Sequence, residues 1–198
     1  MGNWFAFVFC LSTYFTTSWY ICQTLVGSTR PVLATWLTFT IGSWSSLYTY
    51  IVAERKSRGE ARILNNLSNV TSSIQTALVT IVLISMGVPL LENEFQKWCW
   101  AANALILAYY YRSKNAERAN WAIQGVMTIA YFPTFYHLGT TSRNTESFVM
   151  WGVGGFFTAL ACIPPLRQRN WKAVGYAGRS AVLTGVVLYM MFRLVQRQ

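Results

Sequence analysis

Long stretches without a formal charge constrain this chain more than any motif does. Five of them are 20 residues or longer, at 4–29, 31–53, 63–91, 119–142 and 147–166. A run at 98–111 is shorter, and a run at 173–192 is interrupted only by Arg179. A helix needs about 20 mostly apolar residues to cross ~30 Å of hydrocarbon. We therefore predict an all-α integral membrane protein with seven transmembrane helices and no separate soluble domain.

The fourth predicted span has an alternative interpretation. The expected spans are 4–26, 32–53, 72–91, 96–112, 119–138, 146–164 and 173–194. The fourth contains only 14 consecutive uncharged residues, but Lys97 and Arg112 at its ends can extend their side chains toward water. A re-entrant or interfacial segment would also explain this length, and every later loop would then change sides.

Composition argues against an enzyme or a metal protein. Charged residues make up 11% of the chain, against roughly 25% in soluble domains. The chain has no Asp, one His (His137) and six Glu, so a clustered hydrolase or metal site is difficult to build. We expect no catalytic residues, no metal and no cofactor. Because no carboxylate lies in the middle of a span, we expect facilitated passage rather than proton coupling.

Basic residues set the expected orientation. The net charge is +10, which in a soluble protein would suggest nucleic acid. Here the bases lie mainly in short loops, so no nucleic-acid partner is expected. Ten Lys and Arg residues flank the spans on the side of the N-terminus and five on the other side. The positive-inside rule then predicts a multi-pass protein of the cell (inner) membrane with a cytoplasmic N-terminus and an outer C-terminus.

The two halves of the chain resemble each other when one is shifted by 112 residues. The aligned pairs include Gly27 with Gly139, Gly42 with Gly154, Trp36 with Phe148, and Phe39 with Trp151. Chance similarity between apolar spans is the alternative explanation. A true repeat would divide the chain into three-helix units at 1–91 and 119–198, joined by a linker helix and loops at 92–118. Such units insert in the same direction, about an axis along the membrane normal.

Two segments carry a resemblance to a known superfamily. Tyr131-Phe132-Pro133-Thr134 lies late in the fifth span, and Asn144-Thr145-Glu146-Ser147 precedes Trp151 in the sixth. With the plan of three spans, a linking span and three spans, they resemble the SWEET sugar transporters and their PQ-loop relatives, including the PnuC vitamin transporters. The resemblance implies two parallel three-helix bundles with a solute pathway between them. The chain departs from the family in having Pro-Thr for Pro-Gln, no proline at Ile21-Cys22, and an expected orientation opposite to that of the SWEET proteins.

Polar and aromatic residues inside the predicted spans are the candidates for solute binding. They are Trp36, Asn69, Gln75, Gln124, Trp151, Tyr176 and Arg179. The resemblance implies this role for the regions that contain Asn69, Gln75, Tyr176 and Arg179. Trp rings can stack on a sugar or heterocycle, although large aromatics also fill helix interfaces. Arg179 either binds an anionic group or extends to the water interface, and Pro133 forms either a hinge or a fixed kink.

These features predict facilitated transport of a small polar solute, such as a sugar or a vitamin-like molecule. The alternative is a non-transporting membrane subunit or scaffold in a larger complex, because the chain is small, rich in Trp and without a decisive site. The expected partners are the lipid bilayer, the solute, and further copies of the chain or other membrane proteins. A cavity lined by Trp36, Gln75, Gln124, Trp151 and Tyr176 would favour transport. Side chains filling that space would favour the subunit.

Overall fold

The chain is all-α in the part that the computed structural model describes, namely the backbone of residues 2–58, 67–113, 116–167, 169 and 171–197. Some helical side chains, including that of Tyr176, lie outside the described set. Within these limits the helices are α1 (Gly2–Leu25), α2 (Leu33–Arg58), α3 (Leu67–Ser85), α4 (Glu94–Arg112), α5 (Ala116–Ile129), α6 (Phe132–Thr140), α7 (Phe148–Leu160), α8 (Ile163–Arg167) and α9 (Trp171–Gln196). The prediction of an all-α fold is confirmed.

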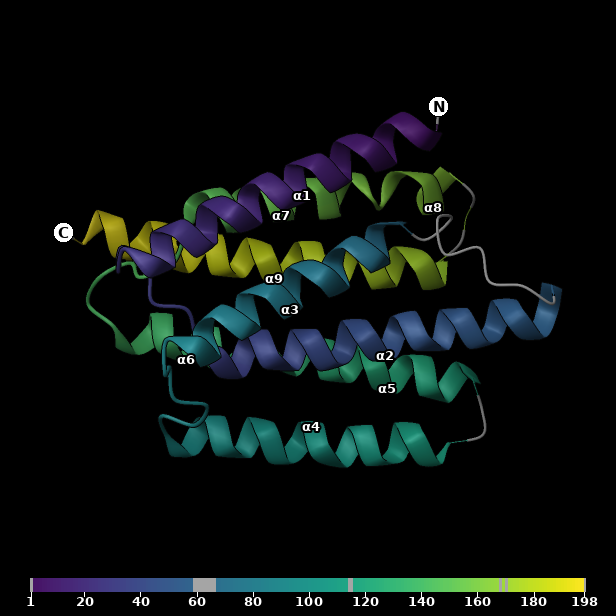
Figure 1. The fold of residues 1–198 in the computed structure, drawn as a ribbon, viewed down its shortest axis with the longest axis horizontal. Helices are drawn as coiled ribbons and strands as arrows, with labels where there is room; N and C mark the ends of the chain where they lie inside the picture. Colours follow the sequence, from purple (N-terminus) through teal and green to yellow (C-terminus); the bar gives the residue numbers. More distant parts are fainter. Residues whose placement is uncertain (1, 59–66, 114–115, 168, 170, 198) are drawn as a thin grey trace.

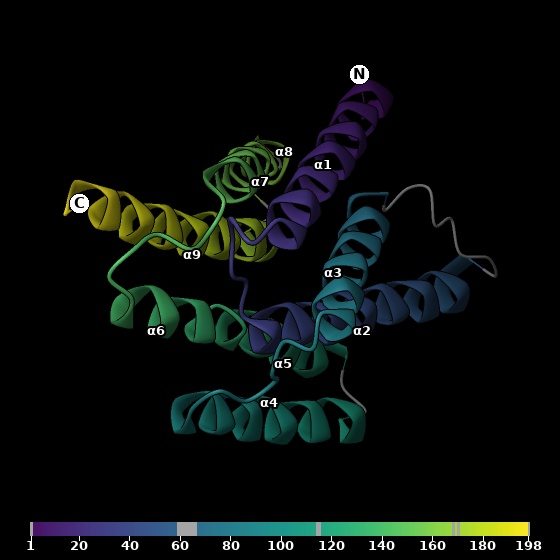
Figure 2. The same cartoon turned by 60° about the vertical axis from the view of Figure 1, so that its left-hand side comes forward.

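In each half of the chain the last helix packs between the earlier segments. Helix α3 contacts both α1 and α2, and α9 contacts α7 as well as α5 and α6. Figures 1 and 2 show α3 between α1 and α2, and α9 between α7 and α6. The halves meet where α1 packs on α7 and where α2 packs on α5 and α6.

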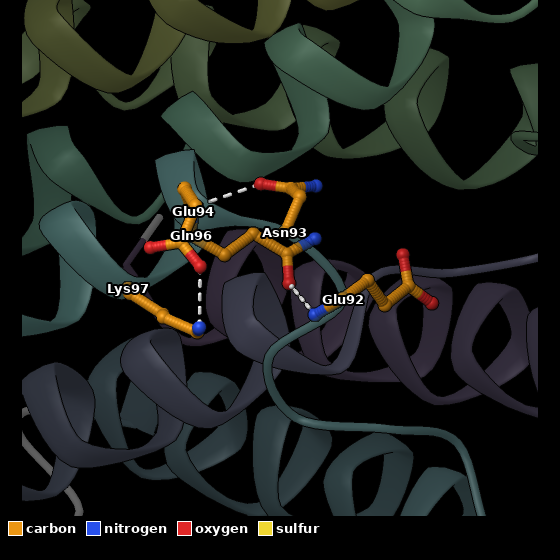
Figure 3. Close-up of polar contacts among 5 residues, drawn as sticks. All are labelled: Glu92, Asn93, Glu94, Gln96 and Lys97. Atoms are coloured by element: carbon orange, nitrogen blue, oxygen red, sulfur yellow. Dashed lines mark hydrogen bonds and ion pairs between the residues drawn. The ribbon is translucent and has the colours of Figure 1, made fainter.

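Helix α4 lies at the edge of the bundle, mainly against α5 (Figure 1). Its 19 residues give a length of about 28 Å at the usual helical rise. Figure 3 shows how it begins: Asn93 Oδ1 accepts the Gln96 N–H at 2.9 Å, and Gln96 Oε1 accepts the Glu92 N–H at 2.7 Å. Glu94 and Lys97 form an ion pair within the first turn of the helix. These contacts satisfy donors that a helix N-terminus leaves unpaired, so α4 starts at a defined residue.

The predicted fifth span, 119–138, is two helices rather than one. Helix α5 ends at Ile129 and α6 begins at Phe132, with Pro133 in its first turn. Proline is tolerated there because the N–H it lacks would have no partner within the helix. The chain therefore breaks at residues 130–131, directly before the proline.

The predicted third span, 72–91, extends past the end of α3. Gly87 has a φ of +70°, and the Val88 N–H donates to the Leu83 carbonyl at 3.1 Å. This is the glycine-based ending that closes many helices, because glycine adopts the left-handed conformation without steric cost. Gly27, with a φ of +74°, follows α1 in the same conformation.

Many large apolar side chains lie on the outside of the bundle, and many polar side chains are buried beside its apolar core. Large hydrophobic residues are exposed around the bundle, among them Phe15, Ile81, Trp98, Leu105 and Val182, each more than 60% exposed. The buried polar residues are mainly Ser and Thr on the inner faces of the helices. Soluble proteins rarely expose large apolar areas unless these contact a partner or lipid.

By length and mean hydropathy, one stretch of the described helices, Gly178–Gln196 in α9, is long and apolar enough to cross a bilayer. Asn69–Ser85 and α7 are apolar but shorter. Hydroxyl groups lower the hydropathy of α2, although several of them bond within the helix, as Thr38 does to the Ala34 carbonyl at 2.7 Å. This one stretch does not by itself establish a membrane protein.

Candidate functional site

Five aromatic rings meet where the two halves of the chain pack together. This aromatic cluster consists of Tyr20, Trp36, Phe39, Tyr131 and Trp151, all buried. The centroids of Trp36 and Trp151 are 6.3 Å apart, and Tyr20 lies 5.3 Å from Trp36. Tyr131 is 4.9 Å from Phe39 and 5.9 Å from Trp151. The first three rings come from α1 and α2 and the last two from the second half, so the cluster joins the halves.

The carboxylate of Glu146 lies against this cluster, in the loop between α6 and α7. Its Oε2 accepts a hydrogen bond from the Tyr20 hydroxyl at 2.7 Å and another from the Trp151 indole N–H at 3.0 Å. The Trp36 indole N–H donates to the Tyr20 hydroxyl oxygen at 3.3 Å. Glu146 is only 4% exposed, and its Oε1 has no hydrogen-bond partner. The carboxyl group thus connects α1 to α7, and the Tyr20 hydroxyl extends this network to α2.

The loop that carries Glu146 is held by its own side chains and by the other half of the chain. Asn144 Oδ1 accepts the Glu146 N–H at 3.1 Å, and its Nδ2 donates to the Glu146 carbonyl at 3.0 Å. The Arg30 backbone N–H donates to the Thr145 carbonyl at 2.8 Å. His137 Nε2 and Thr145 Oγ1 are 3.0 Å apart. These contacts fix the carboxylate in position at the boundary between the halves.

Hydroxyl pairs continue along the interfaces beside the cluster. Thr35 and Thr134 pair at 2.8 Å, which joins α2 to α6. Tyr131 and Thr184 pair at 3.2 Å between the start of α6 and α9. Within the first half, the pairs are Ser43 with Thr76 at 3.1 Å and Thr40 with Thr80 at 2.9 Å. The interfaces are therefore rich in groups that can exchange hydrogen bonds with water or a polar solute.

Four of the predicted binding residues lie at the cluster, at the boundary between the halves or between α2 and α3. Trp36 and Trp151 belong to the aromatic cluster and contact each other. Gln75 reaches the sulfur of Met150, the neighbour of Trp151, with Nε2 at 3.6 Å. Asn69 donates from Nδ2 to Ser46 Oγ at 3.3 Å between α3 and α2.

Gln124 and Arg179 form a separate contact between α5 and α9. Arg179 Nη1 donates to the Gln124 backbone carbonyl at 2.8 Å, and its Nη2 donates to Ser180 Oγ at 2.9 Å. The Gln124 side chain is buried, and neither atom of its amide has a hydrogen-bond partner. The side chain of Tyr176, the remaining predicted residue, lies outside the described set.

Burial raises the pKa of the Glu146 carboxyl to about 7, although the hydrogen bonds from Trp151, Tyr20 and the Ser147 backbone lower it in part. The site can therefore gain or lose a proton near neutral pH. The part of the chain that the structure describes holds no group of three or more His, Cys, Asp or Glu residues placed to bind a metal. No protein-family model, curated protein or solved structure matches this chain.

Sequence reasoning identified the two Trp residues of this site but missed the role of Tyr20. Glu146 was recognisable as an acid beside a span, and the segment around it carried the family resemblance. Tyr20 lies 126 residues away in sequence, on a helix whose neighbours depend on the tertiary packing. A Tyr in an apolar run is an ordinary interface residue, so the sequence held no signal that would pair it with Glu146.

Proposed function

We propose that the chain is a multi-pass membrane protein that passes a small polar solute between its two three-helix units, 1–91 and 119–198. In this proposal α4 is the linking span, and seven segments cross the bilayer. The solute is a neutral or weakly charged molecule of the sugar or vitamin-like class. The aromatic cluster and Glu146 close the pathway at one end.

The membrane location is supported by the exterior of the bundle. Exposed Phe, Trp, Leu and Val side chains on α1, α3, α4 and α9 would face water in a soluble protein, where so much apolar surface is unfavourable. Buried Ser and Thr are the small polar residues that help helices pack in lipid. Helix α4, about 28 Å long at the usual rise, has the length that a span requires.

The contact between Trp36 and Trp151 is the observation that carries the proposal of a pathway. The two residues were selected from the sequence as aromatics of matched spans, and they meet across the boundary between the halves. In transporters built from repeats, solute sites lie at the interface of the repeats. The packing of α3 between α1 and α2, and of α9 between its own neighbours, supports two similar units.

Uptake into liposomes tests the proposal directly. The purified chain is reconstituted, and influx of labelled sugars and vitamins is measured across a panel. We expect flux of one solute class, reduced by Trp36→Ala and by Trp151→Ala. Trp121→Ala is the matched control, because Trp121 is exposed on the outside of α5. Equal flux in all three variants, or no flux for any solute, would refute transport through this interface.

Orientation is tested by labelling single cysteines with a maleimide that does not cross membranes. The four native cysteines are replaced by serine, and Ser28→Cys and Arg167→Cys are compared in intact cells. Both positions are exposed, and they lie on opposite predicted sides. With a cytoplasmic N-terminus, Ser28→Cys reacts from outside and Arg167→Cys reacts only after permeabilisation. The reverse pattern would invert the proposed orientation.

One observation favours the alternative of a non-transporting subunit. Trp36 and Trp151 are only 3% and 6% exposed, so rings rather than open space occupy the interface at this level. A transporter must separate these rings during its cycle, whereas a scaffold keeps them in contact. A flux panel with no hits, together with co-purification of a defined membrane partner, would establish the subunit.

A further inference from the structure

Glu146 has an environment that suits a neutral carboxyl group better than a carboxylate. Its two side-chain hydrogen-bond donors both reach Oε2, and its Oε1 is buried without a side-chain partner. The Ser147 backbone also stabilises the charged form, but burial outweighs all three donors. An ionised carboxylate removed from water is costly unless several donors or a cation compensate it. Protonation removes the charge and leaves Oε2 able to accept the same two bonds.

Among the side chains that the structure describes, none around Glu146 supplies a compensating cation. Glu146 contacts Tyr20 of α1 and Trp151 of α7, and Trp36 of α2 bonds to the Tyr20 hydroxyl. None of these three carries a charge near neutral pH. The titratable side chains bordering its loop are Arg30, Arg143 and His137. The side chains of Arg30 and Arg143 are exposed, and His137 bonds to Thr145 rather than to the carboxylate. Glu92, further along the same end of the bundle, is also exposed.

The Glu146 carboxyl group lies at the boundary between the two halves, so its protonation depends on whether the halves are in contact. Tyr20 and Trp36 belong to the first half, whereas Glu146 and Trp151 belong to the second. If these halves part at this end, the Tyr20 contact is lost and water reaches Glu146. A hydrated carboxylate is stable, so opening favours the ionised form and closing favours the protonated form.

We propose that Glu146 is a proton-binding site at which closure of this end of the bundle takes up a proton from solution and opening releases it. No other atom is exchanged: the proton joins a carboxylate oxygen on closing and returns to water on opening. If the proposed function holds, entry of the solute at this end is coupled to proton release. This goes beyond the facilitated, uncoupled passage that the sequence predicts.

The raised pKa of Glu146, about 7, agrees with this assignment in sign. A hydrated Glu titrates near 4.5, so the closed form binds the proton more tightly than the open form. The ratio of closed to open protein is then constant below about pH 4.5 and falls as the pH rises to about 7. Over that range the ratio changes by up to about 300-fold.

Infrared difference spectroscopy tests the proton site without any solute. The chain contains six Glu and no Asp, so few side chains contribute to the carbonyl band of protonated carboxyl groups. Spectra recorded between about pH 5 and about pH 8 should contain a band that titrates near neutral pH. Glu146→Gln should remove it, and Glu94→Gln, which alters an exposed carboxyl group, should leave it. A band that survives Glu146→Gln would overturn the assignment.

Accessibility of a buried cysteine tests the link to closure. Val32 is buried directly before α2, and its carbonyl accepts the backbone N–H of Trp36 at 3.4 Å; Ser28 is exposed in the same loop. In the protein without native cysteines, the labelling rate of Val32→Cys is divided by that of Ser28→Cys to correct for thiol ionisation. The ratio should rise with pH and become independent of pH once Glu146→Gln is added. A ratio that does not depend on pH, or one that Glu146→Gln leaves unchanged, would refute the link.

Neither readout requires transport, so the two proposals fail separately. A panel without flux would overturn the proposed function while the infrared band and the labelling ratio still report the proton site. Conversely, flux without a Glu146 band would preserve transport and exclude the proton site.

Discussion

Replacing Tyr20 by phenylalanine keeps a ring in the aromatic cluster and removes one hydroxyl group. That hydroxyl donates to Glu146 Oε2 at 2.7 Å and accepts from Trp36 at 3.3 Å, so the variant removes one of the two side-chain donors to the carboxyl group. A hydrogen bond contributes about 1.5–3 kcal/mol when one partner is charged and about 0.5–1.5 kcal/mol when both are neutral. We expect Tyr20→Phe to lose about 2 kcal/mol of stability with Glu146 ionised and about 1 kcal/mol with it protonated.

The assay is thermal unfolding in detergent at about pH 8 and about pH 5, combined with the infrared titration. A difference of about 1 kcal/mol between the two protonation states moves the infrared midpoint upward by about 0.7 pH units. Tyr48→Phe is the matched control, because the Tyr48 side chain is exposed, and it should change neither quantity. Equal losses of stability at both pH values, with an unmoved midpoint, would show that the Tyr20 hydroxyl does not interact with the charge on Glu146.

Three further predictions concern stability measured by reversible unfolding. The pKa of Glu146 is raised in the folded protein to about 7, so its favourable contribution to the free energy of unfolding is complete below about pH 4.5 and is lost as the pH rises through about 7, by up to about 3 kcal/mol. Glu146→Gln should abolish this pH dependence of stability. A pH dependence that persists in the variant would assign it to other groups. Asn93→Ala removes the cap of α4 and should cost about 1 kcal/mol, whereas no loss would show that the end of α4 frays without penalty. A Cβ atom at Gly155 would lie 2.9 Å from the Thr184 methyl group, so Gly155→Ala should cost about 1–3 kcal/mol of stability. Gly152→Ala is the control, because a Cβ atom there meets open space. Equal effects of the two variants would exclude close packing as the cause.

The sequence predicts the helical segments well because their main signal is local. Charged residues are rare over most of each segment, so the predicted spans end within a few residues of the bounds of α1, α2 and α9. Pro133 likewise predicts a disturbance of the fifth segment, because its ring and missing N–H act on the adjacent turn. The break into α5 and α6, and the early end of α3 at Gly87, depend on backbone conformations that composition does not determine.

The site depends on contacts between distant parts of the chain, and these were only partly predictable. The alignment pairs Trp36 with Phe148 and Trp151 with Phe39, yet the residues in contact are Trp36 and Trp151. Equivalent positions in a repeat need not touch each other, because contact is decided by how the units face each other. The burial of Glu146 arises from the same packing of α1 on α7, which no local pattern encodes.

The break between α5 and α6 makes the two halves mechanically unequal. Helix α1 is continuous over 24 residues, whereas the segment that the sequence alignment pairs with it is divided beside Tyr131. Rotation about residues 130–131 would turn α6 as a short lever and draw the following loop, with Glu146, away from Tyr20. The first half would then keep its position. The conformational change that exposes the carboxyl group would occur at a hinge of about two residues rather than across a whole helix bundle.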